Sequence, residues 1–191
     1  MNKIQKAVEF AIVVHKGQTR KGGNNPFILH PLESGIIAQS ILTQLGMESE
    51  IDEVVAAAIL HDTIEDTNVT EEDIMNRFGQ NILDMVLWQS EDKTKSWHER
   101  KSYTLESLDN LNDSKESELL KILILADKLA NMREIKRDYD KLGDKLWDIF
   151  NVKDKAKHKW YYQGIRDKTV SLRGVREYKE YSILISQVFD S

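Results

Sequence analysis

Apolar residues recur at helical spacing along most of the chain. Residues 3–16 carry apolar side chains at about every third or fourth position, and the pattern resumes at His30-Pro31 and stops at Gly46. Proline suits the first turn of a helix, whereas the polar, glycine-rich residues 22–26 are typical of a loop. The pattern therefore predicts two helices joined by a loop.

Two later segments are apolar around most of their circumference. The predicted helix over residues 50–64 contains an unbroken apolar run at 54–60, and a second helix contains a nearly unbroken run at 119–126. A helix without a wide polar face is buried on several sides. We therefore expect these two helices at the centre of the fold, and we expect the second to end near Met132-Arg133.

The remaining segments also predict helices. Thr70 followed by Asp73 resembles a capping box at a helix start. Residues 140–191 alternate charged and aromatic residues, which fits two or three amphipathic helices. Apart from a short extended piece at 27–29, no alternating strand pattern persists. The predicted fold is all-α, a single domain over residues 1–191 with the helices of 140–191 packed on the rest.

Composition narrows the function classes. The absence of cysteine excludes a thiolate nucleophile and a disulfide framework, and it fits a reducing compartment. No run has the length of a signal peptide or of a membrane span of about 20 apolar residues. The formal net charge of −5 argues against broad nucleic-acid binding. We expect a soluble cytoplasmic protein with no membrane or nucleic-acid partner; the sequence does not determine its oligomeric state.

Polar residues end both apolar runs. His61-Asp62 follows the first run, and Asp127 follows the second. Burying such groups without partners costs on the order of several kcal/mol. A divalent metal supplies the partner, because imidazole and carboxylate are ordinary ligands for manganese, iron and zinc. His30, between loop and helix, completes a candidate set of two histidines and two carboxylates that leaves positions open for water and substrate.

Two further carboxylates follow the histidine-aspartate pair. Glu65 and Asp66 lie four residues after His61 and Asp62, which on a helix places them one turn along the same faces. Clustered carboxylates repel one another unless a metal or a raised pKa relieves the repulsion. Glu65 and Asp66 are therefore candidate acid/base groups acting on metal-bound water.

Each residue also has a structural interpretation when it is taken alone. A histidine-aspartate pair is more often structural than metal-binding. Asp127 can pair with Lys128 or Arg133, and His30 can cap its helix. The joint pattern, rather than any one member, favours the metal site.

Two basic stretches are candidates for phosphate or base contact. Arg20-Lys21 beside a glycine pair can hold phosphate or stack on a base, although a solvated turn is the more frequent role. Within the second stretch, a charged surface loop is the favoured interpretation for each residue: Lys93, Lys95, Arg100 and Lys101.

Four motifs, in this order, resemble those of alarmone hydrolases. They are HKGQTRK at 15–21, PFILHP at 26–31, LHDTIEDT at 60–67 and DKLANM at 127–132. The chain is similar to the stand-alone small enzymes of this family and to the hydrolase half of the long Rel-type enzymes, over most of its length.

The resemblance implies an all-α HD-domain helical bundle that binds Mn²⁺, with Fe²⁺ or Zn²⁺ as other candidates. It implies removal of the 3′-pyrophosphate from guanosine 3′,5′-bis(diphosphate) and its pentaphosphate relative. Carried over by motif, four residues would bind the metal: His30, His61, Asp62 and Asp127. Glu65 and Asp66 would position and activate the attacking water.

The same resemblance implies contacts to a nucleotide, the one expected small-molecule partner. Arg20 and Lys21 would contact the nucleotide, Asn131 the ribose side, and Lys93 a phosphate. Glu134 departs from the pattern, since threonine is common there in the long enzymes. Two rival functions stay open: an HD phosphohydrolase of another nucleotide, and a nucleotide-sensing HD module without turnover.

Overall fold

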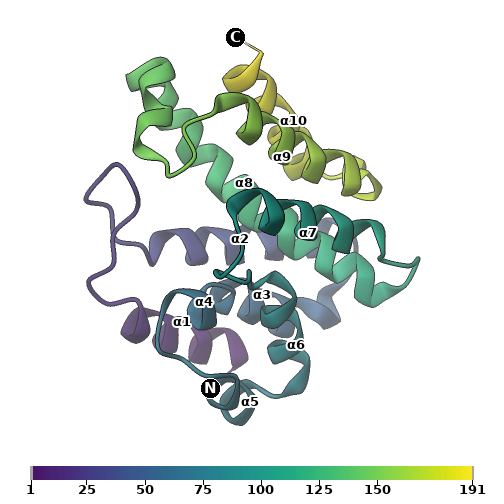
Figure 1. Cartoon of the computed structure of the whole chain (residues 1–191). Coiled ribbons are helices and arrows are strands. Elements are labelled where there is room, and N and C mark those ends of the chain that lie inside the picture. The colour runs from purple at the N-terminus through teal and green to yellow at the C-terminus, as the bar shows by residue number, and fades with distance from the viewer. Residues whose placement is uncertain (1, 191) are drawn as a thin grey trace.

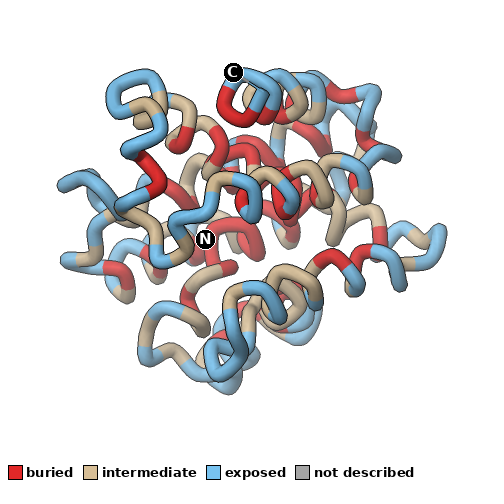
Figure 2. Tube along the Cα trace, turned by 45° about the horizontal axis from the view of Figure 1, so that its top comes forward, coloured by how far each residue is buried: buried red, intermediate tan, exposed pale blue. Residues whose placement is uncertain are grey.

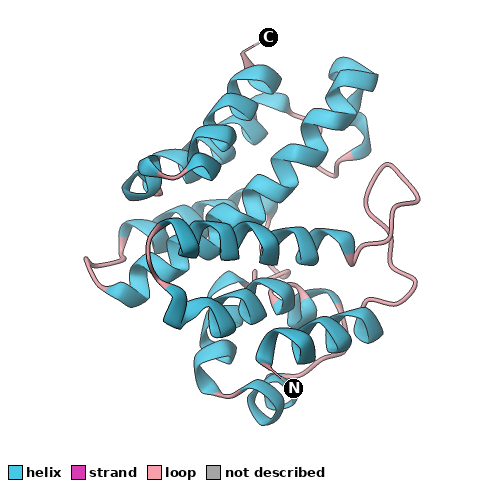
Figure 3. Cartoon of the chain, turned by 180° about the vertical axis from the view of Figure 1, so that it is seen from behind, coloured by secondary structure: helices cyan, strands magenta, loops and turns pink. Residues whose placement is uncertain are grey.

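Helices form the named elements throughout residues 2–190, which are the residues that the computed structural model describes (Figure 3). No β-strand is present within that range; an isolated antiparallel bridge joins Thr19 to Pro26. The extended piece expected at 27–29 is instead a turn that leads into a helix at Leu29. The all-α fold predicted from the sequence is confirmed.

The elements follow one another with short connections. The α-helices in chain order are α1 (Lys3–Val14), α2 (Leu29–Gln44), α3 (Ile51–Leu60), α4 (Thr63–Asp66), α5 (Glu71–Phe78), α6 (Gln80–Gln89), α7 (Trp97–Asp109), α8 (Lys115–Leu142), α9 (Lys155–Lys168) and α10 (Arg176–Phe189). Three 3-10 helices separate some of them: η1 (Glu48–Glu50), η2 (Gly143–Ile149) and η3 (Val170–Gly174). Among the described residues, no helix is both long enough and apolar enough to cross a membrane.

Helices α3 and α8 lie at the centre, as their apolar sequences predict. Every residue from Val54 to Leu60 is buried, and α3 packs against α1, α2, α6 and α8. Figure 1 shows α8 running between the N-terminal helices on one side and α9 and α10 on the other, and α10 packs directly on α8. The buried stretches gather where these helices face one another (Figure 2).

The predicted end of α8 near Met132-Arg133 is wrong. The helix continues to Leu142 and spans 28 residues, because no glycine or proline interrupts it before Gly143, whose φ of +57° ends the helix. Asp127 therefore lies in the interior of the helix and not at its end. Its burial comes from the packing around α8.

The predicted helix over residues 50–64 is also divided in two. Helix α3 ends at Leu60, and a turn at His61 and Asp62 leads into the short α4. The amide of Asp66 still donates to the carbonyl of Asp62 over 2.8 Å, so one helical turn separates these two residues despite the interruption. The capping box of Thr70 and Asp73 is present as predicted.

Helices α2 and α3 are in close contact at Gly35. A β-carbon on Gly35 would lie 2.8 Å from Cγ1 of Ile59, whereas one on Gly174 would meet nothing within 4 Å. Alanine gains about 1 kcal/mol over glycine inside a helix, but overpacking a core costs about 1–3 kcal/mol. We expect Gly35→Ala to lower the free energy of unfolding in urea and Gly174→Ala not to lower it. An unchanged or higher midpoint for Gly35→Ala would contradict this close contact.

Candidate metal centre and substrate cavity

Three side chains from neighbouring elements converge on one buried point. Helix α2 supplies His30, and the turn after α3 supplies His61 and Asp62; their donor atoms all lie within 4.8 Å of one another. The Nε2 atoms of the two histidines are 3.2 Å apart, and Oδ2 of Asp62 lies 3.0 Å from His61 Nε2. This grouping is the compact core of the candidate metal centre.

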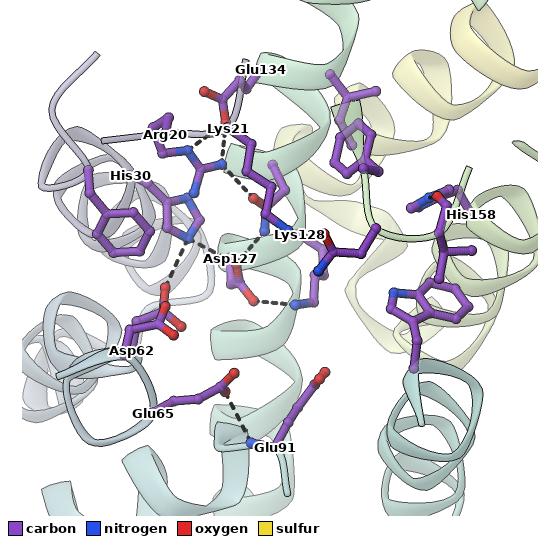
Figure 4. A pocket seen from close by; sticks show the side chains of 18 of the residues that line it. Arg20, Lys21, His30, Asp62, Glu65, Glu91, Asp127, Lys128, Glu134 and His158 are labelled. Atoms are coloured by element: carbon purple, nitrogen blue, oxygen red, sulfur yellow. Dashed lines mark hydrogen bonds and ion pairs between the residues drawn. The ribbon is translucent and has the colours of Figure 1, made fainter. Parts of the chain in front are cut away.

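Asp127 approaches the same point from α8. Its Oδ1 atom lies 3.3 Å from Nε2 of His30 and 3.8 Å from Nε2 of His61 (Figure 4). Asp127 has partners on its own helix as well: Asn131 Nδ2 donates to Oδ1 over 2.7 Å, and Lys128 Nζ lies 2.6 Å from Oδ2. The structure thus brings all four predicted ligands together, with Asp127 slightly outside the compact group of three.

The chemistry of these donors fits a divalent metal. The Nδ1 atom of His61 lies 2.8 Å from the carbonyl of Ala58, and a proton held there leaves Nε2 free to donate its lone pair. Two imidazole nitrogens and two carboxylates facing one another in a buried site have few ways to satisfy all their polar atoms within the protein. A cation with nitrogen and oxygen ligands satisfies them together.

The charges in this cluster are strongly coupled. Burial lowers the pKa of His30. Burial also opposes charge on His61, but the neighbouring carboxylate of Asp62 raises the pKa of His61 to about 9. In the same way His61 outweighs the burial of Asp62 and lowers its pKa to about 2. The ammonium group of Lys128 likewise outweighs the burial of Asp127 and lowers its pKa. Both carboxylates therefore keep their negative charge, which attracts a cation.

Glu65 and Asp66 stand beside this centre on α4. The Oε2 atom of Glu65 accepts from the backbone amide of Glu91 over 3.1 Å, and burial raises the pKa of the Glu65 carboxyl. Asp66 forms an ion pair of 2.5 Å with Lys93. A partly buried carboxyl with a raised pKa beside a metal centre is suited to proton transfer.

A cavity of about 610 Å³ opens over the cluster. Arg20, Lys21 and Asn131 line it, whereas Lys93 is half exposed and does not. Arg20 pairs with Glu134, donates to Oδ1 of Asn131 over 2.8 Å and lies above the ring of Phe27 (Figure 4). The structure therefore places three of the four predicted nucleotide contacts in the cavity and the fourth on the Asp66 side chain.

Several cavity residues were missed or misjudged from the sequence. The sequence favours a charged surface loop for Arg100 and Lys101, but both lie on α7, line the cavity and pair with Glu91. The capping box of Ser96 and Glu99, now seen at the start of α7, was the available signal for a helix here. The wall formed by residues 149–152 had no recognisable signal, because it depends on how the chain returns after α8.

Comparison with known proteins identifies the family. A family model described as an HD domain matches residues 7–152. The chain belongs to the HD domain family. The match includes all four candidate ligands of this HD domain and ends before α9. The predicted extent of the domain, residues 1–191, stays a prediction.

Curated relatives of this HD domain share one name. It is 38% identical over 135 residues to the guanosine-3′,5′-bis(diphosphate) 3′-pyrophosphohydrolase MESH1 of Xenopus tropicalis, with 70% of each chain covered. It is 33% identical over 132 residues to human MESH1, covering 69% of this chain and 68% of that protein. It is 45% identical over 83 residues to the guanosine-3′,5′-bis(diphosphate) 3′-pyrophosphohydrolase of Aquifex aeolicus, covering 44% of this chain and 11% of that protein. These matches confirm the family resemblance found in the sequence.

Solved structures agree with the fold of this HD domain. A structure described as a metazoan orthologue of SpoT that hydrolyses ppGpp superimposes with a TM-score of 0.72 over 97% of this chain and 94% of that chain, at 23% identity. A protein from Listeria monocytogenes EGD-e superimposes with a TM-score of 0.69 at 33% identity, over 87% of this chain and 99% of that chain. The first likeness supports the fold alone.

The compact grouping around Asp62 leads to a test of metal binding. We expect Asp62→Ala to lose most of its bound divalent metal, because it removes the carboxylate that lies 3.0 Å from His61 Nε2. The measurement is metal content by mass spectrometry after gel filtration. Asp84→Ala is the matched control, since Asp84 is an exposed carboxylate that accepts from Gln80 elsewhere on the surface. Full metal occupancy in folded Asp62→Ala protein would remove Asp62 from the ligand set.

Proposed function

We propose that this chain is a manganese-dependent hydrolase that removes the 3′-pyrophosphate from guanosine 3′,5′-bis(diphosphate) and its pentaphosphate relative. One observation carries the proposal: a metal-type cluster, a pair of acid/base carboxylates and an arginine-lysine pair line a single cavity. The shared name of the curated relatives supports this substrate. Several of those relatives are similar over two thirds or more of their own length.

The proposed ligands of Mn²⁺ are His30, His61, Asp62 and Asp127, and Fe²⁺ or Zn²⁺ are alternatives with the same donor types. When bound, such an ion lowers the pKa of a water ligand and polarises a phosphoryl oxygen. The protein contributes the fixed positions of the donors. Ala58 orients the ring of His61, and Asn131 and Lys128 orient the carboxylate of Asp127.

We assign proton transfer to Glu65 and Asp66. The oxygen of a water molecule bonds to the phosphorus attached to the ribose, and the bond from that phosphorus to the 3′ oxygen breaks. One of the two carboxylates takes the water proton, and the 3′ oxygen of the released nucleotide gains a proton. Glu65 is the better placed of the two as base. Its carboxylate is held by the amide of Glu91 and lies 3.7 Å from Lys93 Nζ, whereas Asp66 is tied to Lys93 in a closer ion pair of 2.5 Å.

We assign the nucleoside end of the substrate to the part of the cavity around Arg20. A guanidinium above the ring of Phe27 offers a planar cation on which a base can stack. Lys21 adds a second positive charge, and Asn131 lies between Arg20 and Asp127 for a contact to the ribose. Lys93 stays a candidate for a phosphate contact, which requires that it exchange its ion pair with Asp66 for one with the substrate phosphate. The proposed setting is the cytoplasm, with the nucleotide as the small-molecule partner.

The decisive experiment is a metal-dependent activity panel. We expect manganese-loaded protein to release one pyrophosphate for each guanosine 3′,5′-bis(diphosphate) consumed, and we expect EDTA to stop the release. Ion chromatography of the products would identify them. Product from a different nucleotide only would favour another HD phosphohydrolase. Tight binding of the alarmone at full metal occupancy without any product would favour a sensing module.

The raised pKa of Glu65 gives a prediction for the pH profile. A base with a raised pKa keeps its proton to higher pH, so kcat falls as pH drops through a value above the ordinary 4.5 of glutamate. We expect Glu65→Gln to lower kcat by about 10²–10⁴-fold with its metal content intact. Asp66→Asn should retain the acid limb of the profile that Glu65 sets. If Asp66→Asn loses this limb and Glu65→Gln keeps it, the two roles are reversed.

A further inference from the structure

Three cationic side chains form a wall of the cavity on the side of Glu91. Arg100 and Lys101 come from α7 and Lys128 from α8, and their side chains are 22%, 15% and 13% exposed. Figure 4 shows Glu91 on one side of Asp127 and Arg20 with Lys21 on the other. The wall is therefore separate from the proposed nucleoside end of the cavity.

Among the described residues, these three cations form ion pairs with only two carboxylates. Arg100 Nη1 lies 2.7 Å from Glu91, Lys101 pairs with the other oxygen of Glu91, and Lys128 lies 2.6 Å from Asp127. If Asp127 binds a divalent metal, its negative charge is shared with that ion. Glu91 then balances three positive charges with one negative charge. Partly buried charges of one sign call for a counterion.

The wall is held in place without further anionic groups. The ring of Tyr161 lies 4.8 Å from Nζ of Lys101 and 5.7 Å from Nζ of Lys128, so both ammonium groups contact one aromatic ring. The shared ring holds two flexible lysine side chains in place, but it carries no negative charge and so leaves their positive charges unneutralised. The two ammonium groups are thus arranged for a ligand that carries more than one negative charge.

Hydrogen-bond donors on the same wall lack acceptors. The Nε–H of Arg100 and the side-chain NH₂ of Gln89 are buried and have no hydrogen-bond partner among the described residues, and the Oε1 atom of Gln89 also lacks one. Both residues line the cavity. Buried donors without acceptors are rare in folded proteins and mark places where a ligand or water supplies the acceptor. An acceptor-rich anion satisfies the unpaired donors and the surplus charge together.

We infer that Arg100, Lys101 and Lys128, with Gln89 beside them, form the pyrophosphate-binding wall of this enzyme. The inference rests on the proposed function, since it assigns the diphosphate leaving group to this side of Asp127 while the nucleoside lies at Arg20. Pyrophosphate carries several negative charges and many acceptor oxygens, which matches three cations and unpaired N–H groups. The wall would hold the diphosphate before cleavage and pyrophosphate after it.

The test is calorimetric binding of inorganic pyrophosphate to the manganese-loaded protein, with the variants compared at equal metal content. We expect Lys101→Gln to bind at least about tenfold more weakly than the wild type and Lys101→Arg to restore most of the affinity. Lys6→Gln is the matched control, because Lys6 is exposed and lines neither this cavity nor the neighbouring one that shares Arg100 and Lys128 with it. Its affinity should equal that of the wild type. Circular dichroism would confirm that each variant is folded.

A second variant is expected to change the affinity for pyrophosphate in the opposite direction. Glu91→Gln removes the single dedicated carboxylate, so we expect it to bind pyrophosphate several-fold more tightly than the wild type. The inference is overturned if the wild type binds no pyrophosphate, if Lys101→Gln binds like the wild type, or if only Arg20→Gln weakens binding. Because binding is measured without turnover, wall-dependent binding in a protein that releases no pyrophosphate from the alarmone would overturn the proposed function and leave the wall in place.

Discussion

The fold depends on placing four polar side chains where three apolar helix surfaces meet. His30, His61 and Asp127 are each less than a tenth exposed, although residues 54–60 of α3 are all apolar and residues 119–126 of α8 nearly so. Isolated groups of this kind would oppose folding, since each loses its hydration on burial. Together they attract and satisfy one another, and they can share a cation. The packing of α2, α3 and α8 therefore depends on these polar residues being present together.

The centre of this arrangement could be predicted from the sequence because its signals are local. His61-Asp62 directly follows an apolar run, and Asp127 interrupts one, so a polar group is visible against an apolar background. The position of His30 between a loop and a helix predicts it as their partner, and the family motifs imply the same. Helix boundaries were less predictable: α3 divides at His61 because the side chain of Thr63 and the ring of His61 bond to carbonyls of the preceding turn. The spacing of hydrophobic residues carries no information about such hydrogen bonds.

The basic wall was misjudged for a related reason. Lys93, Lys95, Arg100 and Lys101 look alike in sequence, yet the first two are exposed and the last two line the cavity. What separates them is the start of α7, which turns Arg100 and Lys101 toward Glu91 and the ring of Tyr161. Burial of a charge depends on partners that are distant in sequence. Composition and spacing therefore cannot distinguish a surface lysine from a cavity lysine.

The unbroken length of α8 has a consequence for how the chain can vary. Its 28 residues form a rod of about 42 Å that carries Lys128, Asp127, Asn131 and Glu134 in fixed angular order. One residue inserted between Asp127 and Glu134 would rotate all later positions of the helix by about 100°. Glu134 would then point away from Arg20, while Asp127 would stay in place. Substitutions along the rod preserve this order, and changes of length do not. Insertions and deletions should therefore accumulate in the connections before Lys115 and after Leu142, and not within the helix.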